Sequence, residues 1–498
     1  MASIYFVGPY PPIMCGIATY TNYLVREFHS EKWGVLSFDM DTYGAPLTDD
    51  ALTDRAWYGI PSRDRFSAKH IIDGLTHLNT RMDDAILWFQ HETAIWADPE
   101  MFTSMLQQLN LPKIVTFHTL HFQSNETESG LRKYQYDLLK NLLPHVDAIT
   151  VFTYGVYRSV VTAFPEYYAK IFVTKHGVHS YPEINKLSHK EARGKLYDFL
   201  FYESALDQND KQALYRQRIF SDPNALLLGQ TGFLCPLKHS ESLYSVRDNL
   251  QQLIPDKRIV AVRIGTARED SQRIYAQQLR SNIKDSNTFL LETWLPSEML
   301  PLAQRAFDIN FYWPDECTQS GVIAHALGAG AIVAGRDLEG VGETLKEAGQ
   351  IADTDINNLT IKIKHLLLDP ELQLRTEQKA LKYADEFSWE SQARRHYELA
   401  EPILRTIPLW EKSRLPSGIN ALAASAARRA EMNIPVRNQA LPRYSAPIPQ
   451  RPAKPSSADY PENYLTTNNS TSQPSIKPRR GLRAQIYRLT GRRLHDLH

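Results

Sequence analysis

The stretch FYWPDECTQSGVIAHALGAG, residues 311–330, changes from apolar to hydrogen-bonding residue types and back within one short span. Its three leading aromatic residues suit the end of a buried strand, and Pro314 ends that strand because proline denies the sheet a donor. A hydroxyl-, amide- and carboxylate-bearing loop then precedes a small-residue helix predicted over 322–329. Such a helix directs unpaired N–H groups at the space before it, where phosphate commonly binds.

The alternative interpretation of this stretch is structural. Thr318 and Ser320 could simply cap the helix, and its small residues could simply let it lie close to a sheet. Two further junctions favour the ligand interpretation: LLLGQTGFLCPLK (226–238), and SIYFVGPYPPIMCGIATYT (3–21), where a helix begins near Gly16 or Ile17. All three junctions run from strand to loop, and ligands bind at such strand ends in open parallel sheets.

Composition indicates a large α/β protein of at least two domains plus an appendage, since 498 residues exceed one ordinary core. Lys+Arg and Asp+Glu both number 56, so the chain has no net positive charge that would favour binding to nucleic acid. The three cysteines, at positions 15, 235 and 317, are an odd number without paired spacing. They indicate a reducing compartment and small side chains beside a ligand rather than a catalytic thiol. Without a long apolar run or leader pattern, we expect a cytoplasmic protein.

Strand and helix patterns alternate through both halves of the chain. Strands are predicted over residues 4–7, 34–38, 85–89, 114–117, 148–152 and 171–173. In the second half they are predicted from residue 226 into the glycine that follows, and over 259–264, 288–291, 306–312 and 331–334. Alternation of this kind predicts right-handed βαβ units and parallel sheets. The strand ending at residue 89 delivers His91 and Glu92 to a sheet edge, and the next one delivers His118.

The chain resembles the retaining glycosyltransferases of family 4, which use nucleotide-sugar donors, over roughly residues 1–405. The segments that carry the resemblance are PYPPIMCGIATYTNYL (9–24), ILWFQHE (86–92), IVTFHTLHF (114–122), VTKHGV (173–178), GQTGFLCPLK (229–238), VRIGTAREDSQRIYAQQL (262–279) and TQSGVIAHALGAGAIVAG (318–335). The order and spacing of these segments together are specific, whereas any single one is not.

The resemblance implies a GT-B fold, in which two Rossmann-like domains face each other across a cleft. It implies an acceptor-side domain over residues 1–185, a helical connection over 186–222, a nucleotide-sugar domain over 223–385 and a closing helix over 386–408 that returns to the first domain. Beyond residue 409, the chain is rich in Pro, Ala, Ser and Asn, which predicts a disordered linker.

The resemblance also implies roles for particular residues. Lys238 matches the lysine that contacts the donor phosphates, and His118 matches the histidine that touches the transferred sugar. Glu316 lies one residue out of register with a glutamate that holds sugar hydroxyls. The resemblance implies no metal, no cofactor beyond the donor and no nucleophilic side chain. The remaining positions that it assigns to the donor or to the sugar and acceptor are Gly16, Ile17, Gln319, Ser320, Gly321 and His325, and His91 and Glu92.

Two positions depart from the family pattern. His325 stands where many members have a ribose-binding glutamate, and Phe233 stands where they have a phosphate-binding arginine. Trp294 is expected in the core rather than in the wall of a base pocket. The leading interpretation is transfer of a sugar to a carbohydrate, lipid-linked or small acceptor. The alternatives are a catalytically inactive binding or assembly subunit and another GT-B activity, such as an epimerase or phosphorylase.

The segment 477–498 contains six arginines, and no acidic residue occurs between Asn463 and His495. It predicts a short basic amphipathic helix that would contact an anionic membrane surface, at the inner face, or an acidic protein partner. The alternative is a solvated basic tail.

Overall fold

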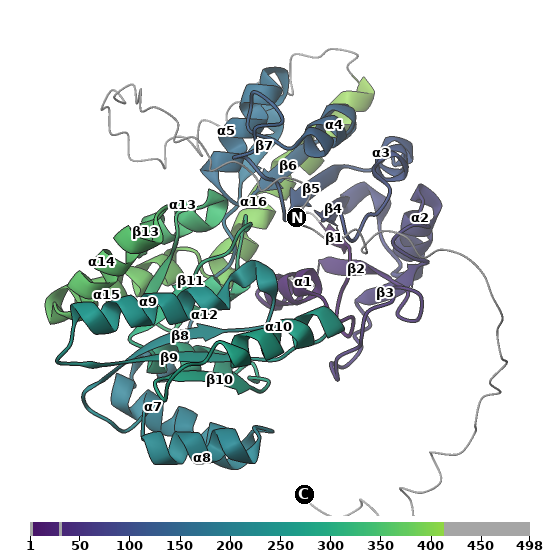
Figure 1. Ribbon diagram of the computed structural model, residues 1–498. Coiled ribbons are helices and arrows are strands. Elements are labelled where there is room, and N and C mark those ends of the chain that lie inside the picture. The colour runs from purple at the N-terminus through teal and green to yellow at the C-terminus, as the bar shows by residue number, and fades with distance from the viewer. Residues whose placement is uncertain (1–2, 29–31, 413–498) are drawn as a thin grey trace, which may run out of the picture. The chain divides into compact units, whose positions relative to one another are not determined.

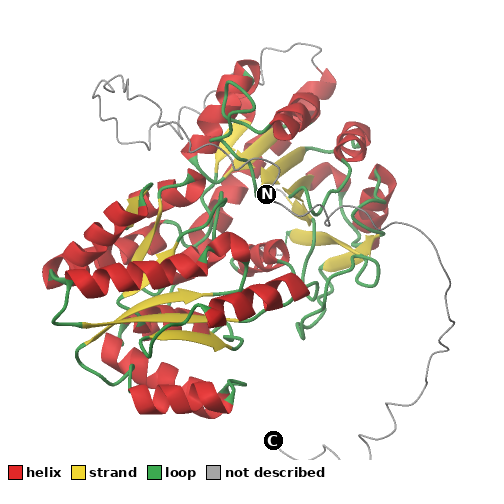
Figure 2. Cartoon of the chain, in the orientation of Figure 1, coloured by secondary structure: helices red, strands yellow, loops and turns green. Residues whose placement is uncertain are grey.

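The computed structural model describes residues 3–28 and 32–412, with side chains up to residue 405. The described chain contains two parallel sheets, each covered by helices (Figures 1 and 2). The basic tail and nearly all of the predicted linker lie outside the described residues. The proposed contact of segment 477–498 with a membrane or a protein therefore stays a prediction.

The first sheet has seven parallel strands in the order β3-β2-β1-β4-β5-β6-β7. Its strands are β1 (Ser3–Val7), β2 (Trp33–Phe38), β3 (Ala56–Ile60), β4 (Ala85–His91), β5 (Lys113–Phe117), β6 (Ala148–Val151) and β7 (Ile171–Val173). Every residue of β4 is buried, as the continuous apolar run AILWF predicts for a strand covered on both faces. The helices of this lobe are α1 (Gly16–Arg26), α2 (Ala68–His77), α3 (Pro99–Gln108), α4 (Lys133–Leu142) and α5 (Tyr154–Ala163).

The second sheet has six parallel strands in the order β10-β9-β8-β11-β12-β13. Its strands are β8 (Ala225–Thr231), β9 (Arg258–Gly265), β10 (Thr288–Glu292), β11 (Ile309–Tyr312), β12 (Val333–Arg336) and β13 (Ile351–Asp353). Its helices are α9 (Ser240–Leu253), α10 (Asp270–Ser281), α11 (Met299–Ala306), α12 (Gly321–Gly328), α13 (Glu339–Glu347), α14 (Ile356–Leu367) and α15 (Pro370–Glu386). Both sheets therefore have the strand order of a dinucleotide-binding fold.

Three helices connect the two sheets: α6 (Pro182–Asn185), α7 (His189–Asp198) and α8 (Gln208–Gln217). Their apolar residues, with those of the π-helical turn Phe199–Glu203, pack against the face of the second sheet that carries Val260 and Val262. The charged helical stretch predicted between the two halves of the chain thus exists, and it belongs to the core of the second lobe.

The last described helix, α16 (Trp389–Lys412), returns to the first lobe (Figure 1). Trp389, Ala393 and Ala400 pack in one core cluster with Ile4 and Trp88 of the first sheet. Where the chain crosses back, Val178 donates its N–H to the carbonyl of Phe387 at 2.9 Å. The two crossings between the lobes therefore lie side by side.

Most predicted elements are present, with their ends displaced by one to four residues. The strand predicted over 306–312 begins only at Ile309, because Ala306 is the last residue of α11. The strand predicted over 331–334 is β12, which runs two residues later. The edge strands β3 and β13 were not predicted, since each is short and only partly buried.

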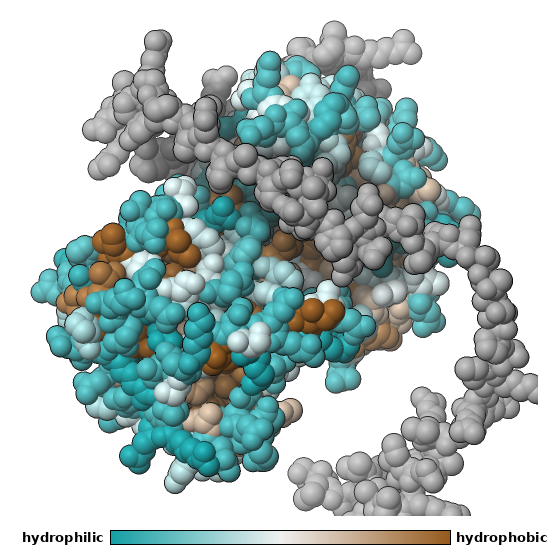
Figure 3. Space-filling view, viewed as in Figure 1, coloured by the Kyte–Doolittle hydropathy of each residue, from teal (hydrophilic) through white to brown (hydrophobic). Residues whose placement is uncertain are grey.

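Among the described residues, no helix combines the length and apolar character needed to cross a bilayer. The face shown in Figure 3 is mostly hydrophilic, with separate apolar patches. Scattered apolar side chains of this kind are normal on a protein surface.

Three glutamates spaced four residues apart on α13 connect the second lobe to the first. We call Glu339, Glu343 and Glu347 the glutamate face of α13. Glu339 pairs with His121 at 2.9 Å and accepts the N–H of Phe122. The side chains of Glu339 and His121 are both buried. Glu347 lies 2.6 Å from the buried ammonium of Lys175.

Glu343 makes the most extensive of these contacts. Its carboxylate accepts the N–H groups of Tyr154 and Gly155 at 2.6 and 2.7 Å, at the start of α5, and lies 3.2 Å from the Lys175 Nζ. These N–H groups have no partner within their own helix, and the helix dipole favours a negative charge there. One carboxylate of the second lobe thus caps a helix and neutralises a buried lysine of the first.

We predict that Glu343→Ala lowers the free energy of unfolding by about 3 kcal/mol, because it leaves two helix N–H groups without their acceptor and removes one of the two carboxylates beside the buried Lys175. Urea unfolding followed by circular dichroism measures the change. Glu398→Ala is the matched control: Glu398 is exposed on α16, so its effect should stay within about 0.5 kcal/mol. A Glu343→Ala midpoint equal to that of wild type would contradict the assigned role.

Candidate anion-binding site at the junction of the two sheets

The strand order of the second sheet reverses between β8 and β11, which are neighbours. The loops that leave their carboxyl ends, residues 232–239 and 313–320, are joined directly. Asp315 donates its N–H to the carbonyl of Leu237 at 3.1 Å, and its carboxylate lies 2.5 Å from His239 Nε2. In open α/β sheets, ligands bind at this reversal point, so the fold singles out these two loops.

Lys238 ends the short 3₁₀ turn Pro236–Lys238 in the first of these loops. A Cβ atom placed on Gly232 would have two close neighbours: the Nζ of Lys238 at 3.0 Å and the Cγ2 of Val322 at 3.5 Å. The ammonium is therefore beside the first turn of α12. Gly232 has a φ of +103°, so glycine suits this position both by conformation and by space.

No carboxylate of the described residues forms an ion pair with Lys238. Burial, and after it the positive charge of Arg263, lowers the pKa of Lys238 to about 8. Arg263 is fully buried, and burial lowers its pKa to about 10. Its guanidinium donates only to uncharged oxygens: Ser240 Oγ and the carbonyls of Gln230, Phe233 and Ile264. Two neighbouring cations without an acid make this region suited to an anion.

The N-terminus of α12 opens beside Lys238. Ser320 caps the helix by accepting the N–H of Ile323 at 3.4 Å, and its own N–H donates to the side chain of Gln319. Gly321 is exposed, and a Cβ built on it would meet no atom within 4 Å. The space before the helix is therefore open. At Gly16, the first residue of α1, a built Cβ likewise meets nothing, and Cys15 provides no side-chain cap.

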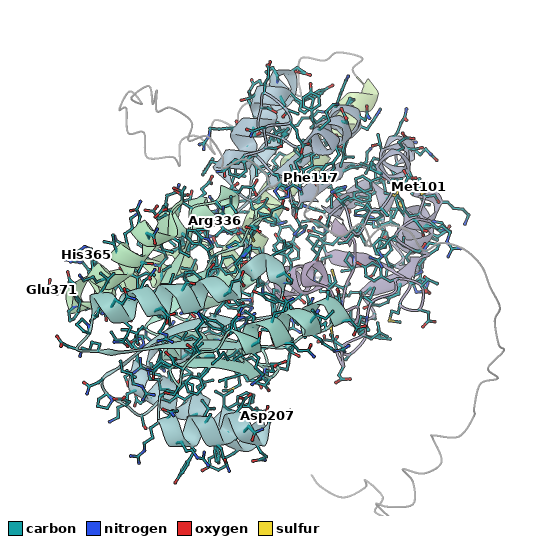
Figure 4. All side chains as sticks on the ribbon, in the orientation of Figure 1. Met101, Phe117, Asp207, Arg336, His365 and Glu371 are labelled. Atoms are coloured by element: carbon teal, nitrogen blue, oxygen red, sulfur yellow. The ribbon has the colours of Figure 1, made fainter. Side chains whose placement is uncertain are left out.

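His118 brings the first lobe to this region. Its Nε2 lies 2.7 Å from Gln90 Oε1, and its ring lies edge-on to Tyr20. Thr318, in the loop before α12, donates its hydroxyl to the His118 carbonyl at 3.2 Å. Burial lowers the pKa of His118 to about 3, so the imidazole is neutral. The carboxyl ends of the two sheets thus meet; Phe117 and Arg336, labelled in Figure 4, are the last residues of β5 and β12.

His91 is not brought to this site. Its ring is buried against Phe102 and Phe117 in the core of the first lobe, where burial lowers its pKa to about 3. The next residue, Glu92, lies near Thr119 and His121, and burial raises its pKa. Adjacent residues of a strand point to opposite faces, so the neighbour of a cleft residue is often a core residue.

Glu316 and His325, both assigned to the donor, have other partners here. Glu316 pairs with Arg132 of the first lobe at 2.5 Å. His325 hydrogen-bonds the Tyr181 hydroxyl through Nδ1 and stacks on His179 at 4.4 Å. Burial lowers the pKa of His325 to about 4, so it carries no charge at neutral pH.

Cys317 lies between these residues as a thiol. Its Sγ donates to the Gln319 carbonyl at 3.0 Å, and burial raises its pKa. Cys15, Cys235 and Cys317 are all free. Among the described residues, no group of three or more histidines, cysteines and acids could hold a metal ion, so metal independence stays a prediction.

The prediction for Trp294 was wrong. Its side chain is 54% exposed, with its ring 5.8 Å from that of Phe233, because it follows β10 at the same edge of the sheet. Arg263 was not predicted as part of the site. A signal for it exists in RIVAVRIG, where an arginine interrupts an otherwise apolar strand.

A scan of the chain against protein-family models found no match, and neither did a search of curated proteins. Solved structures are similar in fold. HepE from Anabaena, solved with UDP and glucose, gives a TM-score of 0.53 at 12% identity over 80% of this chain and 100% of that chain. Sucrose-phosphate synthase from Thermosynechococcus elongatus gives 0.57 at 13% identity over 82% and 100%.

A UDP-forming trehalose-phosphate synthase from Burkholderia xenovorans gives a TM-score of 0.56 at 13% identity, again over 82% of this chain and 100% of that chain. At these identities the likeness shows the fold alone. The chain has the GT-B arrangement of two Rossmann-like domains.

The buried histidines predict how stability depends on pH. The pKa values of His91, His118, His176, His325 and His396 are lowered to about 3 or 4 by burial. The unfolded chain therefore binds more protons below its own histidine pKa of about 6.5, so stability should fall from there down to about pH 4. Each histidine lowers the free energy of unfolding by up to about 1.4 kcal/mol for each pH unit of acidification in this range.

Urea unfolding at pH 7.5, 6.0 and 5.0 measures this loss. His396→Phe removes one titrating ring, which lies 4.4 Å from that of Trp88, and should make the decline shallower. A midpoint that does not change between pH 7.5 and 5.0 would contradict the assignment.

Proposed function

We propose that the protein is a retaining glycosyltransferase that moves a hexose from a nucleotide-sugar donor to a carbohydrate, lipid-linked or small acceptor in the cytoplasm. The observation that supports it most is the position of Lys238. Its ammonium has no carboxylate partner in the described part of the chain and lies beside the open N-terminus of α12, where the strand order reverses. A diphosphate matches both the charge and the exposed helix N-terminus of that place.

The similar solved structures support the same proposal. HepE has been solved with UDP and with UDP-glucose, and the Burkholderia xenovorans enzyme is described as a UDP-forming synthase. Their fold is shared over at least 80% of this chain, so a nucleotide diphosphate is the anion that we assign to the site.

The main requirement of the proposed reaction is stabilisation of the leaving diphosphate; a nucleophilic side chain is not required. When the bond between sugar and diphosphate breaks, negative charge develops on the departing oxygen. Lys238 and the N–H groups of Ser320 and Gly321 would meet that charge in a preorganised arrangement. The neutral His118, oriented by Gln90, would hydrogen-bond the transferred sugar. Departure and attack on the same face of the sugar would retain its configuration, and neither a metal nor a cofactor takes part.

A binding or assembly subunit is the second candidate. It is favoured by His325, whose ring is held between Tyr181 and His179, and by Glu316, whose carboxylate pairs with Arg132. In this structure these neighbours engage the ring of His325, and Arg132 engages one carboxylate oxygen of Glu316. Another GT-B activity, an epimerase or phosphorylase, would still use the same phosphate-binding loops.

A thermal-shift panel of UDP, GDP, ADP, CDP and TDP separates the first two candidates. The melting temperature of an enzyme should rise by several degrees with one of these nucleotides. The melting temperature of a subunit without a donor site should not change with any of them. In the responding case, Lys238→Ala should lower turnover at least ~100-fold, the usual scale for one lost charge-stabilising donor. Lys257→Ala, at an exposed lysine of the same lobe, should retain wild-type turnover.

The depressed pKa of Lys238 predicts how binding depends on pH. With a pKa of about 8, the ammonium loses its charge as pH rises through that value, so diphosphate affinity should fall by up to about tenfold per pH unit above it. Isothermal titration between pH 7 and 9.5 measures this. Lys238→Arg, which stays charged, should bind with little change across that range; a wild-type affinity that stays level above pH 8.5 would show that Lys238 does not face the anion.

A further inference from the structure

Arg268 lies in the loop between β9 and α10, and its side chain rests on two aromatic rings. Its guanidinium carbon is 3.5 Å from the ring centroid of Phe233 and 5.9 Å from that of Trp294. The two rings are tilted by 34° with their centroids 5.8 Å apart. Three side chains from the carboxyl ends of three adjacent strands, β8, β9 and β10, thus form one stack.

The loop that carries Arg268 touches the loop that carries Lys238. Leu234 donates its N–H to the carbonyl of Thr266 at 3.0 Å. A Cβ built on Gly265 would lie 2.0 Å from the Gly232 carbonyl oxygen, so the two backbones are in direct contact. Gly232 is also the residue against which the Lys238 ammonium lies. The stack therefore adjoins the candidate diphosphate site.

Arg268 has no acid partner among the described residues, although Glu269 and Asp270 follow it directly. Asp270 pairs with Arg273 instead. The shift of the Arg268 pKa is downward and comes from burial alone, as expected of a cation against apolar rings without a carboxylate nearby. Elsewhere in this lobe arginines do have acid partners, as Arg280 has in Asp210 and Glu292. Arg268 is nonetheless exposed and can reorient.

The energy that holds Arg268 in the stack is small. A cation over an aromatic ring at an exposed site is only weakly stabilised. A charge-assisted, bidentate hydrogen bond to a phosphate is stronger than that. An arriving phosphate would therefore draw the guanidinium away from Phe233 without a large penalty.

We propose that Arg268 is a second diphosphate-binding cation, which rests on the Phe233 and Trp294 rings in this structure and turns to the phosphates when the donor binds. The proposal rests on the proposed function, because it assumes that the anion beside Lys238 is a nucleoside diphosphate. Phe233 and Trp294 are positioning residues: they hold the guanidinium at the rim of the site.

Isothermal titration of the full chain with UDP, GDP and ADP, and with uridine, guanosine and adenosine, tests the proposal. Arg268→Ala and Arg268→Gln should weaken diphosphate binding at least ~10-fold and leave nucleoside binding unchanged, since the lost contact is to phosphate. The double variant Phe233→Arg with Arg268→Ala should recover affinity to within about threefold of wild type, because it returns a guanidinium to the adjoining loop. Arg273→Ala, at an exposed arginine of α10, is the control and should bind like wild type.

The outcomes that overturn the proposal are distinct. If Lys238→Ala loses diphosphate binding while Arg268→Ala retains it, the proposed function stands and the role of Arg268 is wrong. If Arg268→Ala weakens nucleosides and diphosphates equally, Arg268 contacts the base and not the phosphates, which also overturns it. If wild type binds none of the five nucleoside diphosphates of the thermal-shift panel, the proposed function and this inference fall together.

Discussion

The contacts of the glutamate face of α13 with the first lobe determine how the two sheets meet. Glu343 satisfies two N–H groups at the start of α5 and shares the buried Lys175 with Glu347, while Glu339 pairs with His121. Lys175 and the Glu339–His121 pair have little access to solvent, so removal of a partner there costs more than at an exposed pair. They place the end of β5, and with it His118, against the loop that precedes α12.

Next to this paired junction lies a region whose cations have no acid partner within residues 3–28 and 32–405. Lys238 and Arg263 are close enough for the charge of the arginine to lower the pKa of the lysine. Arg268 rests on aromatic rings beside them. A protein that binds no anion gains nothing from such an arrangement, since a buried charge without a counter-charge is costly. The burial of Arg263 therefore favours a ligand that supplies the missing negative charge, as the proposed diphosphate would.

The sequence predicted the architecture because the information for it is local. Apolar runs such as AILWF mark buried strands, and the loop at 311–330 shows its strand, stop and helix in order. The contacts between the lobes have no local pattern: His121 and Glu339 are 218 residues apart. The wrong prediction for Trp294 and the missing prediction for Arg263 have one cause: a sequence pattern equates hydrophobicity with burial. At this site the tryptophan is exposed and the arginine is buried.

The position of α16 has a consequence for biosynthesis. Trp389, Ala393 and Ala400 cover a face of the first sheet that carries Ile4, Phe6 and Trp88, so strand β1 is covered by a helix that is synthesised about 385 residues after it. Until that helix leaves the ribosome, the nascent first lobe exposes an apolar face. Exposed surface of this kind is what holding chaperones bind and what promotes aggregation. Completion of this lobe, unlike that of the second, is therefore a late event in the life of the nascent chain.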